Sequence, residues 1–230
     1  MTANPLCLAL DLENESRIDQ MVELTRDSVG MYKVGLTTIY GVGIDYIARK
    51  DWPRPLFVDA KLHDIPAQIE GAIEGLRRLK PALVTVHASG GADMLRAAVK
   101  ATQGEFDLVA VSVLTSLNSA DLTELGWSES PEDLVIRLAD IALETGVRGL
   151  VCSPHESAAL RARFGRSDAG GPLIVTPGIR PRGSDNADQR RTLDPKAALE
   201  AGADVLVVGR PITGAADPRI AARSLLDSLT

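Results

Sequence analysis

Three charged residues follow a short apolar run in the stretch Leu56-Phe57-Val58-Asp59-Ala60-Lys61-Leu62-His63-Asp64. The run Leu56-Phe57-Val58 is typical of a buried strand in a parallel sheet. Asp59 and Lys61 are two residues apart, so on a strand their side chains point the same way. A carboxylate and an ammonium that face a core are costly unless they are paired. The pattern therefore predicts a polar site at the end of a strand, with a simple ion pair on a surface loop as the alternative.

The elements that must position these residues alternate along the whole chain. Short apolar runs predict eight strands: Leu6–Asp11, Met31–Leu36, Leu56–Leu62, Leu83–Ala88, Leu108–Leu114, Gly149–Ser153, Leu173–Pro177 and Val205–Gly209. Amphipathic stretches between most of them predict helices, such as Ile65–Leu79, Ala92–Ala101, Pro131–Glu144, Pro154–Phe164 and Lys196–Ala201. A closing helix is expected over Pro218–Leu229, with Asp217 as its N-cap and Pro218 in its first turn.

The alternation predicts the fold class. Strands that alternate with helices indicate parallel βα units, and eight such units in 230 residues predict an α/β fold of the (β/α)8 TIM-barrel type. A doubly wound open sheet is the alternative, but no GxGxxG follows the first strand. No linker rich in Pro, Gly or Ser divides the chain, so we expect residues 1–230 to form a single domain.

Composition narrows the classes of function. Hydrophobic residues make up 45% of the chain and the formal net charge is −6, which argues against non-specific binding to nucleic acid or anionic membranes. A local cationic pocket could still bind an anionic small ligand. Cys7 and Cys152 lie in apolar predicted strands, which favours buried thiols in a reducing compartment. With no secretory signal and no apolar run of membrane-spanning length, we expect a cytoplasmic protein.

The predicted strand ends carry many polar side chains, and active sites of such barrels lie at the carboxyl ends of the strands. Each residue alone has a structural explanation: Asp11 could cap a helix, and His87 could be a hydrogen-bonded core histidine. Together they favour a site at one end of the barrel. The residues concerned are Asp11, Lys33, Asp59, Lys61, Asp64, His87, Thr115, Ser116, Arg180, Gly209 and Arg210.

The loops after the last two strands predict a phosphate site, which is where these barrels usually hold phosphate. They span residues 176–189 and 208–210 and contain Gly178, Arg180, Gln189, Gly209 and Arg210. Glycine lets backbone N–H groups approach an anion, arginine offers planar bidentate donors, and Gln189 adds amide donors. An ordinary loop rich in Gly and Pro is the alternative.

These motifs together resemble the orotidine 5′-phosphate decarboxylase family over essentially the whole chain. The resemblance rests on Leu10-Asp11, Tyr32-Lys33-Val34-Gly35-Leu36, Asp59-x-Lys61-Leu62-His63-Asp64-Ile65-Pro66, Thr85-Val86-His87-Ala88, Val113-Leu114-Thr115-Ser116, Thr176-Pro177-Gly178-Ile179-Arg180, Asp188-Gln189 and Val208-Gly209-Arg210-Pro211-Ile212-Thr213. It implies a carboxy-lyase that converts orotidine 5′-phosphate to UMP and CO2, the last step of UMP synthesis, without a cofactor or metal.

The resemblance also implies catalytic roles. Lys61 would protonate C6 of the pyrimidine, and Asp59 would face the substrate carboxylate. Asp64 would reach into the partner subunit's site of a homodimer. Substrate contacts would come from Asp11, Lys33, Ile65, Gln68, Thr115, Arg180, Gln189, Gly209 and Arg210.

One position departs from the family pattern. Gln68 stands where the family usually has a threonine that touches the neighbouring subunit's ribose, and Ala67 precedes it where Asn or Gly is frequent. Gln68 can still form a hydrogen bond, so the departure bears on the detail of the ribose contact. Arg182 and the pair Arg190-Arg191 make the phosphate loop unusually basic.

Two other functions remain open from the residues alone. A Mg2+-dependent phosphosugar lyase or aldolase shares the Asp-x-Lys-x-x-Asp frame, with its carboxylates binding metal and an enediolate. Sensitivity to a chelator would distinguish it. The second alternative is a non-catalytic barrel that binds a phosphorylated metabolite. Turnover of a substrate would distinguish an enzyme from such a binding protein.

Overall fold

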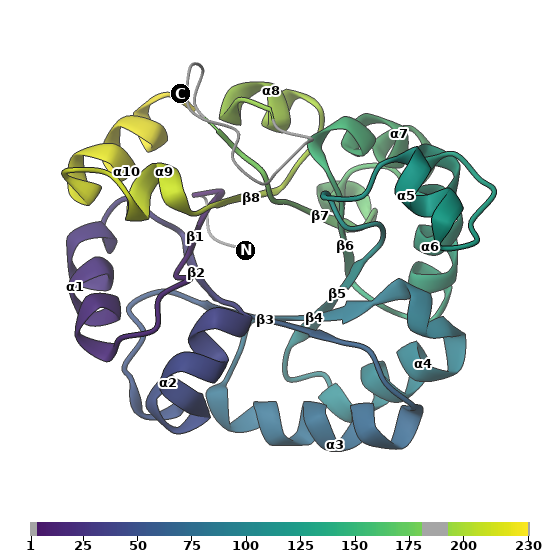
Figure 1. Cartoon of the computed structure of the whole chain (residues 1–230), viewed down its shortest axis with the longest axis horizontal. Helices are drawn as coiled ribbons and strands as arrows, with labels where there is room; N and C mark the ends of the chain where they lie inside the picture. The colour runs from purple at the N-terminus through teal and green to yellow at the C-terminus, as the bar shows by residue number, and fades with distance from the viewer. Residues whose placement is uncertain (1–3, 181–192, 230) are drawn as a thin grey trace.

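The computed structural model describes residues 4–180 and 193–229. Eight parallel strands form a closed barrel in chain order, and β8 pairs with β1 (Figure 1). This confirms the predicted (β/α)8 barrel. The strands are β1 (Leu6–Ala9), β2 (Met31–Val34), β3 (Leu56–Leu62), β4 (Leu83–His87), β5 (Asp107–Val111), β6 (Gly149–Val151), β7 (Leu173–Thr176) and β8 (Val205–Val208).

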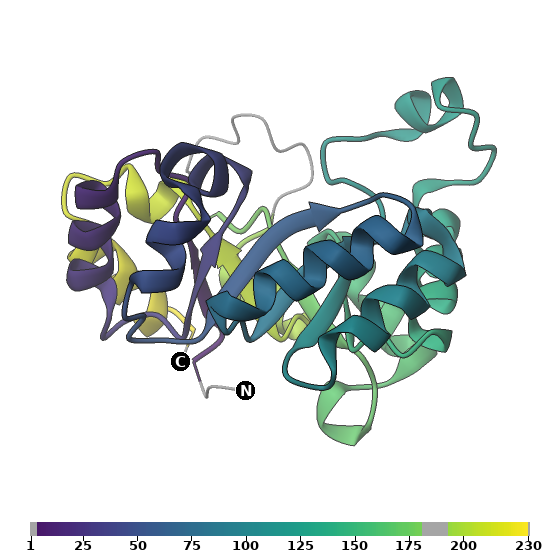
Figure 2. The ribbon, with the colours of Figure 1, turned by 90° about the horizontal axis from the view of Figure 1, so that it is seen from below.

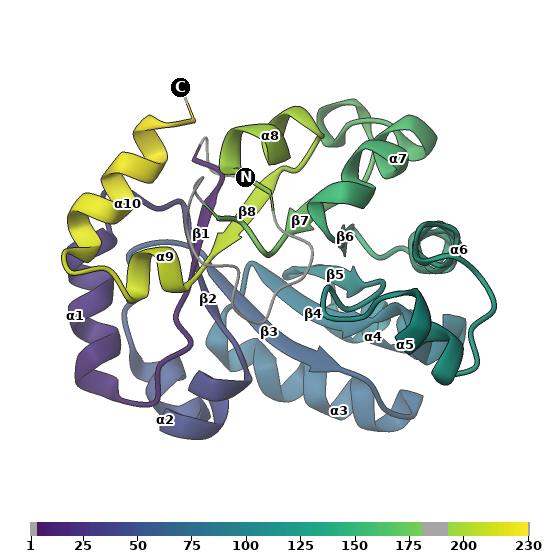
Figure 3. The same cartoon turned by 45° about the horizontal axis from the view of Figure 1, so that its top comes forward.

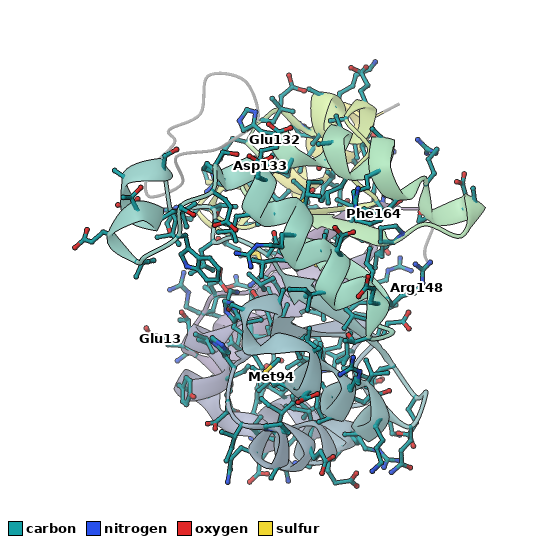
Figure 4. The ribbon with its side chains drawn as sticks, turned by 90° about the vertical axis from the view of Figure 1, so that its right-hand side faces the viewer. Glu13, Met94, Glu132, Asp133, Arg148 and Phe164 are labelled. Carbon is teal, nitrogen blue, oxygen red and sulfur yellow. The ribbon has the colours of Figure 1, made fainter. Side chains whose placement is uncertain are left out.

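An outer layer of helices covers the barrel. Figure 3 shows α10 lying beside α1, so the last helix of the chain covers the barrel next to the first. Figure 4 views the side covered by α4, α6 and α7, with Asp133 at the start of α6 and Phe164 at the end of α7. The helices are α1 (Glu15–Thr25), α2 (Leu36–Arg49), α3 (Pro66–Leu76), α4 (Gly91–Thr102), α5 (Ser119–Glu124), α6 (Pro131–Glu144), α7 (Pro154–Phe164), α8 (Pro195–Glu200), α9 (Arg210–Thr213) and α10 (Pro218–Asp227), with short 3-10 turns at Arg77–Leu79, Ala88–Gly90 and Ser167–Ala169.

The teal segment that carries α5 follows β5 and projects beyond the barrel (Figure 2). Because this segment begins at the carboxyl end of β5, it lies at the end of the barrel where the predicted site residues gather. Within the described part of the chain, no helix has both the length and the apolar character needed to cross a membrane.

The predicted boundaries of β3, α6 and α7 are confirmed, whereas other strands end earlier than expected. The strand expected to reach Leu36 ends at Val34, because Gly35 caps α2 and Leu36 begins it. The strand expected to reach Leu114 ends at Val111. The helices expected from the sequence do not include α2, which contains β-branched residues and kinks at Gly43, where φ is +81°.

The period-two geometry of the strands divides the core into two layers. Along β1, Leu6 and Leu8 face the surrounding helices, while Cys7 and Ala9 face the barrel interior. Both faces are therefore apolar, which explains the nearly continuous apolar runs in the sequence. Both cysteines are buried thiols, as predicted, and burial raises the pKa of the Cys7 thiol to about 12.

Candidate active site

Polar side chains replace apolar ones at the carboxyl end of the barrel interior. On β2 the inward residue Met31 is followed two residues later by Lys33. On β3, Phe57 is followed in the same way by Asp59. The same alternation that fills the barrel with apolar side chains therefore aims charged ones into its open end.

Four of these charges form a continuous array with alternating signs. The Lys33 ammonium lies 3.3 Å from Asp11 Oδ1 and 3.2 Å from Asp59 Oδ2. The other carboxylate oxygen of Asp59, Oδ1, accepts a hydrogen bond from Lys61 Nζ at 2.6 Å. The predicted proximity of the Asp59 and Lys61 side chains is therefore present as a direct contact. The array Asp11–Lys33–Asp59–Lys61 thus fixes two cations and two anions beside one another.

Opposite charges keep the buried members of this array ionised. Burial by itself would raise the pKa of Asp59, but Lys33 and Lys61 outweigh it and hold that pKa below its ordinary value. Burial would likewise lower the pKa of Lys33, but Asp59 and Asp11 outweigh it and raise that pKa. At neutral pH Asp59 is therefore a carboxylate and Lys33 an ammonium.

Local backbone contacts hold Asp11 at the mouth of the site. The Thr38 hydroxyl donates to the carbonyl oxygen of Leu10 and accepts from the N–H of Leu12 at 3.3 Å, so it binds both neighbours of Asp11. A Cβ on Gly35 would lie 3.0 Å from Lys33 Nζ and 3.1 Å from Asp11 Oδ1. The absence of a side chain at Gly35 therefore leaves room for the Asp11–Lys33 pair.

A cavity of about 560 Å³ joins this array to the predicted phosphate loops. Arg180 is buried, and its N–H donates to the carbonyl oxygen of Leu193 at 3.1 Å. Arg210 begins α9, directly after Gly209. The cavity is therefore lined both by the paired charges of the array and by two arginines. The predicted site residues that line it are Asp11, Lys33, Asp59, Lys61, Thr115, Arg180, Gly209 and Arg210.

Five predicted site residues within the described part of the chain do not line this cavity. His87 lies at the end of β4 and Ser116 follows β5, and the other three lie on the surface beyond the end of β3. Asp64, Ile65 and Gln68 are exposed, and the Asp64 carboxylate accepts a hydrogen bond from the N–H of Ile65 at 2.7 Å. Their predicted contacts concern a neighbouring subunit, and a single chain does not test them. Gln189, Arg182 and Arg190-Arg191 lie outside the described residues.

His87, at the end of β4, stacks on His63 with ring centroids 5.3 Å apart. Burial, together with His63 and Lys61 nearby, lowers the pKa of His87 to about 4. His87 is therefore neutral at neutral pH and adds no charge to the array.

Two buried threonines that contact the site are not among the predicted site residues. Thr38 brackets Asp11 as described, and Thr85 hydrogen-bonds to both Asp59 and Lys61. Thr85 belongs to the resemblance motif Thr85-Val86-His87-Ala88, which implies no role for it, and the residue type alone indicates none, because threonine is an ordinary strand residue and is also common near helix starts. Across residues 4–180 and 193–229, no group of three His, Cys, Asp or Glu side chains is arranged to hold a metal ion.

The chain is similar to known orotidine 5′-phosphate decarboxylases over nearly its whole length. An orotidine 5′-phosphate decarboxylase of Thermobifida fusca (strain YX) is 45% identical over 229 residues, which cover 99% of this chain and 96% of that protein. One from Anaeromyxobacter sp. (strain K) is 44% identical over 225 residues, which cover 97% of each. The crystal structure of orotidine 5′-phosphate decarboxylase from Lactobacillus acidophilus matches with a TM-score of 0.84 and 32% identity, covering 99% of both chains.

The profile of one family matches residues 4–225, nearly the whole length. The chain therefore belongs to the orotidine 5′-phosphate decarboxylase / HUMPS family.

Proposed function

We propose that the protein converts orotidine 5′-phosphate to UMP and CO2, the final step of UMP synthesis, and does so without a cofactor. The observation that carries the proposal is the array Asp11–Lys33–Asp59–Lys61 in a cavity that also holds Arg180 and Arg210. The two relatives named above are called orotidine 5′-phosphate decarboxylases, and their similarity to this protein extends over nearly the whole chain.

The reaction demands a fixed positive charge at one carbon. When the bond between C6 and the carboxylate breaks, the electron pair stays on C6, where the pyrimidine ring delocalises it poorly. In the proposed mechanism the Lys61 ammonium lies at C6, stabilises the developing carbanion and then donates its proton to it. The neutral Lys61 amine regains a proton from solvent, so CO2 and UMP are the only products.

Asp59 is proposed to face the carboxylate that leaves. Two lysines hold Asp59 ionised, as its lowered pKa indicates, so the substrate carboxylate meets a negative charge. That repulsion falls as CO2 departs. Asp59 also accepts the hydrogen bond of Lys61 at 2.6 Å, which orients the proton donor before the substrate arrives.

The remaining contacts hold the substrate by its ends. We propose that Asp11 and Lys33 bind the ribose hydroxyls and that Thr115 contacts the pyrimidine. Arg180, Arg210 and the backbone of Gly209 bind the phosphate, with Gln189 as a further contact. Phosphate binding is distant from the bond that breaks, and its binding energy can still assist catalysis by fixing C6 against Lys61.

A second copy of the chain is proposed to complete each site. Asp64 lies beyond β3 with its neighbour Ile65, whose apolar side chain is 64% exposed. In a homodimer these residues and Gln68 would meet the partner's cavity, where Asp64 would approach the partner's lysine and ribose. The expected cytoplasmic location stays a prediction.

Turnover in D2O tests the proposed chemistry. Because ammonium protons exchange with solvent, UMP formed in D2O is expected to carry deuterium at C6, with one CO2 released per UMP. Mass spectrometry of the product and a CO2 assay measure both. Recovery of UMP with hydrogen at C6, or no UMP at all, would contradict the proposal.

A further inference from the structure

The ladder between β3 and β4 is interrupted where the charged array lies. Val58 pairs with Val84 and Leu62 pairs with Val86, so three residues of β3 face one residue of β4. The three are residues 59–61, and the one is Thr85. Backbone groups in such a bulge lose their regular ladder partners and need others.

The Thr85 side chain supplies the missing partner. The Lys61 N–H donates to Thr85 Oγ1 at 2.8 Å, and Thr85 Oγ1 lies 3.0 Å from Asp59 Oδ1. The direction of both hydrogen bonds is fixed by chemistry. A backbone N–H can only donate and an ionised carboxylate can only accept, so the single hydroxyl proton of Thr85 goes to Asp59.

The backbone of Lys61 needs this support because it adopts a left-handed conformation, with φ at +47°. Lys80 and Gln103 are the other non-glycine residues with positive φ among those described, and both lie at helix C-caps, where this conformation is common. Lys61 instead lies inside a strand. A non-glycine residue with this backbone conformation inside a strand is held in it by surrounding contacts, and such positions are frequent at functional sites.

We infer that Thr85 is a positioning residue, whose hydroxyl fixes the Lys61 backbone and the Asp59 carboxylate relative to each other. The inference rests on the proposed function, in which these two groups act on the substrate. Thr85 turns Asp59 so that Oδ1 faces Lys61 and Oδ2 faces Lys33. Without it, the proton donor and the carboxylate would lose their common support.

Substitution by valine isolates the hydroxyl, because Thr85 is fully buried and valine has nearly the same shape. Thr85→Val is expected to lower kcat by about 10- to 100-fold, the effect of losing a hydrogen bond to a charged group. KM should change little, because the proposed phosphate contacts of Arg180 and Arg210 are left intact. Thr85→Ser retains the hydroxyl and is expected to retain most of the activity.

Thr25→Val is the matched control for loss of a buried hydroxyl. Thr25 is also fully buried, and its hydroxyl donates to the carbonyl oxygen of Met21 at 2.7 Å, in α1 and away from the cavity. Thr25→Val is expected to lower the midpoint of unfolding by an amount similar to Thr85→Val and to leave kcat unchanged. If the Thr85 hydroxyl only stabilised the fold, Thr85→Val and Thr25→Val would have the same kcat.

Two measurements on the wild type, Thr85→Val, Thr85→Ser and Thr25→Val test the inference. They are the steady-state kinetics and the rate of hydrogen exchange at the Lys61 amide. Faster exchange of this amide in Thr85→Val than in the wild type supports the contact whether or not the protein turns over substrate. If the wild type is inactive, the proposed function fails and exchange still decides the role of Thr85. The inference is overturned if Thr85→Val retains the kcat of the wild type or the wild-type exchange rate of the Lys61 amide. It is also overturned if Thr85→Ser loses as much kcat as Thr85→Val.

Discussion

Replacing Lys61 with alanine is expected to lower kcat by at least about 10⁴-fold, because it removes the proton donor and the positive charge at C6 together. The barrel should remain folded. Asp59 keeps Lys33 as a partner at 3.2 Å and the hydroxyl of Thr85 as a donor, so no buried charge is left unpaired. Single-turnover kinetics and thermal unfolding of the variant measure the two effects separately.

Lys80→Ala is a matched control for this experiment. Lys80 has the same φ of +47° but is exposed and lies at the end of a short 3-10 turn, away from the cavity. Lys80→Ala removes a lysine from the same left-handed backbone conformation, and we expect it to leave kcat unchanged. Substantial residual turnover by Lys61→Ala would exclude Lys61 as the proton donor.

Mixing two inactive variants should restore activity if each site is shared between subunits. Lys61→Ala and Asp64→Ala are each expected to be nearly inactive. In a random mixture of dimers, half of the sites in each mixed dimer combine native Lys61 from one chain with native Asp64 from the other. About one quarter of the native sites should therefore return, as expected for a two-fold symmetric interface.

The control mixes Lys61→Ala with Asp59→Ala. These side chains meet within one chain at 2.6 Å, so exchange of subunits cannot rebuild an intact pair in either site. Native mass spectrometry of chains of different mass verifies the exchange. No recovery with Asp64→Ala despite verified exchange would argue against a shared site.

Much of the barrel and its charged end could be predicted from residue pattern alone. The period of two along β2 and β3 brings Lys33 and Asp59 to the interior just beyond Met31 and Phe57, and the structure confirms this. The boundaries of β3 were predicted correctly, since its apolar run begins at Leu56 after Pro55. Alternation is a local property, so sequence carries it well.

Features that depend on other parts of the chain could not be predicted in this way. The bulge that turns Lys61 into a left-handed conformation arises from the pairing of β3 with β4 and leaves no mark in the residue types. Thr85 looks like any strand threonine until its hydroxyl is placed between Asp59 and Lys61. The roles of Asp64, Ile65 and Gln68 rest on a second copy of the chain, so only the family resemblance suggested them.

The most direct test of the central claim follows the ultraviolet absorbance of orotidine 5′-phosphate with purified protein in excess EDTA. The proposed mechanism uses only groups of the protein itself, so absorbance should fall with formation of UMP at the same rate as without chelator. No change in EDTA, with activity that returns only with Mg2+, would contradict it. Asp59 and Asp64 would then be candidate metal ligands of a different lyase.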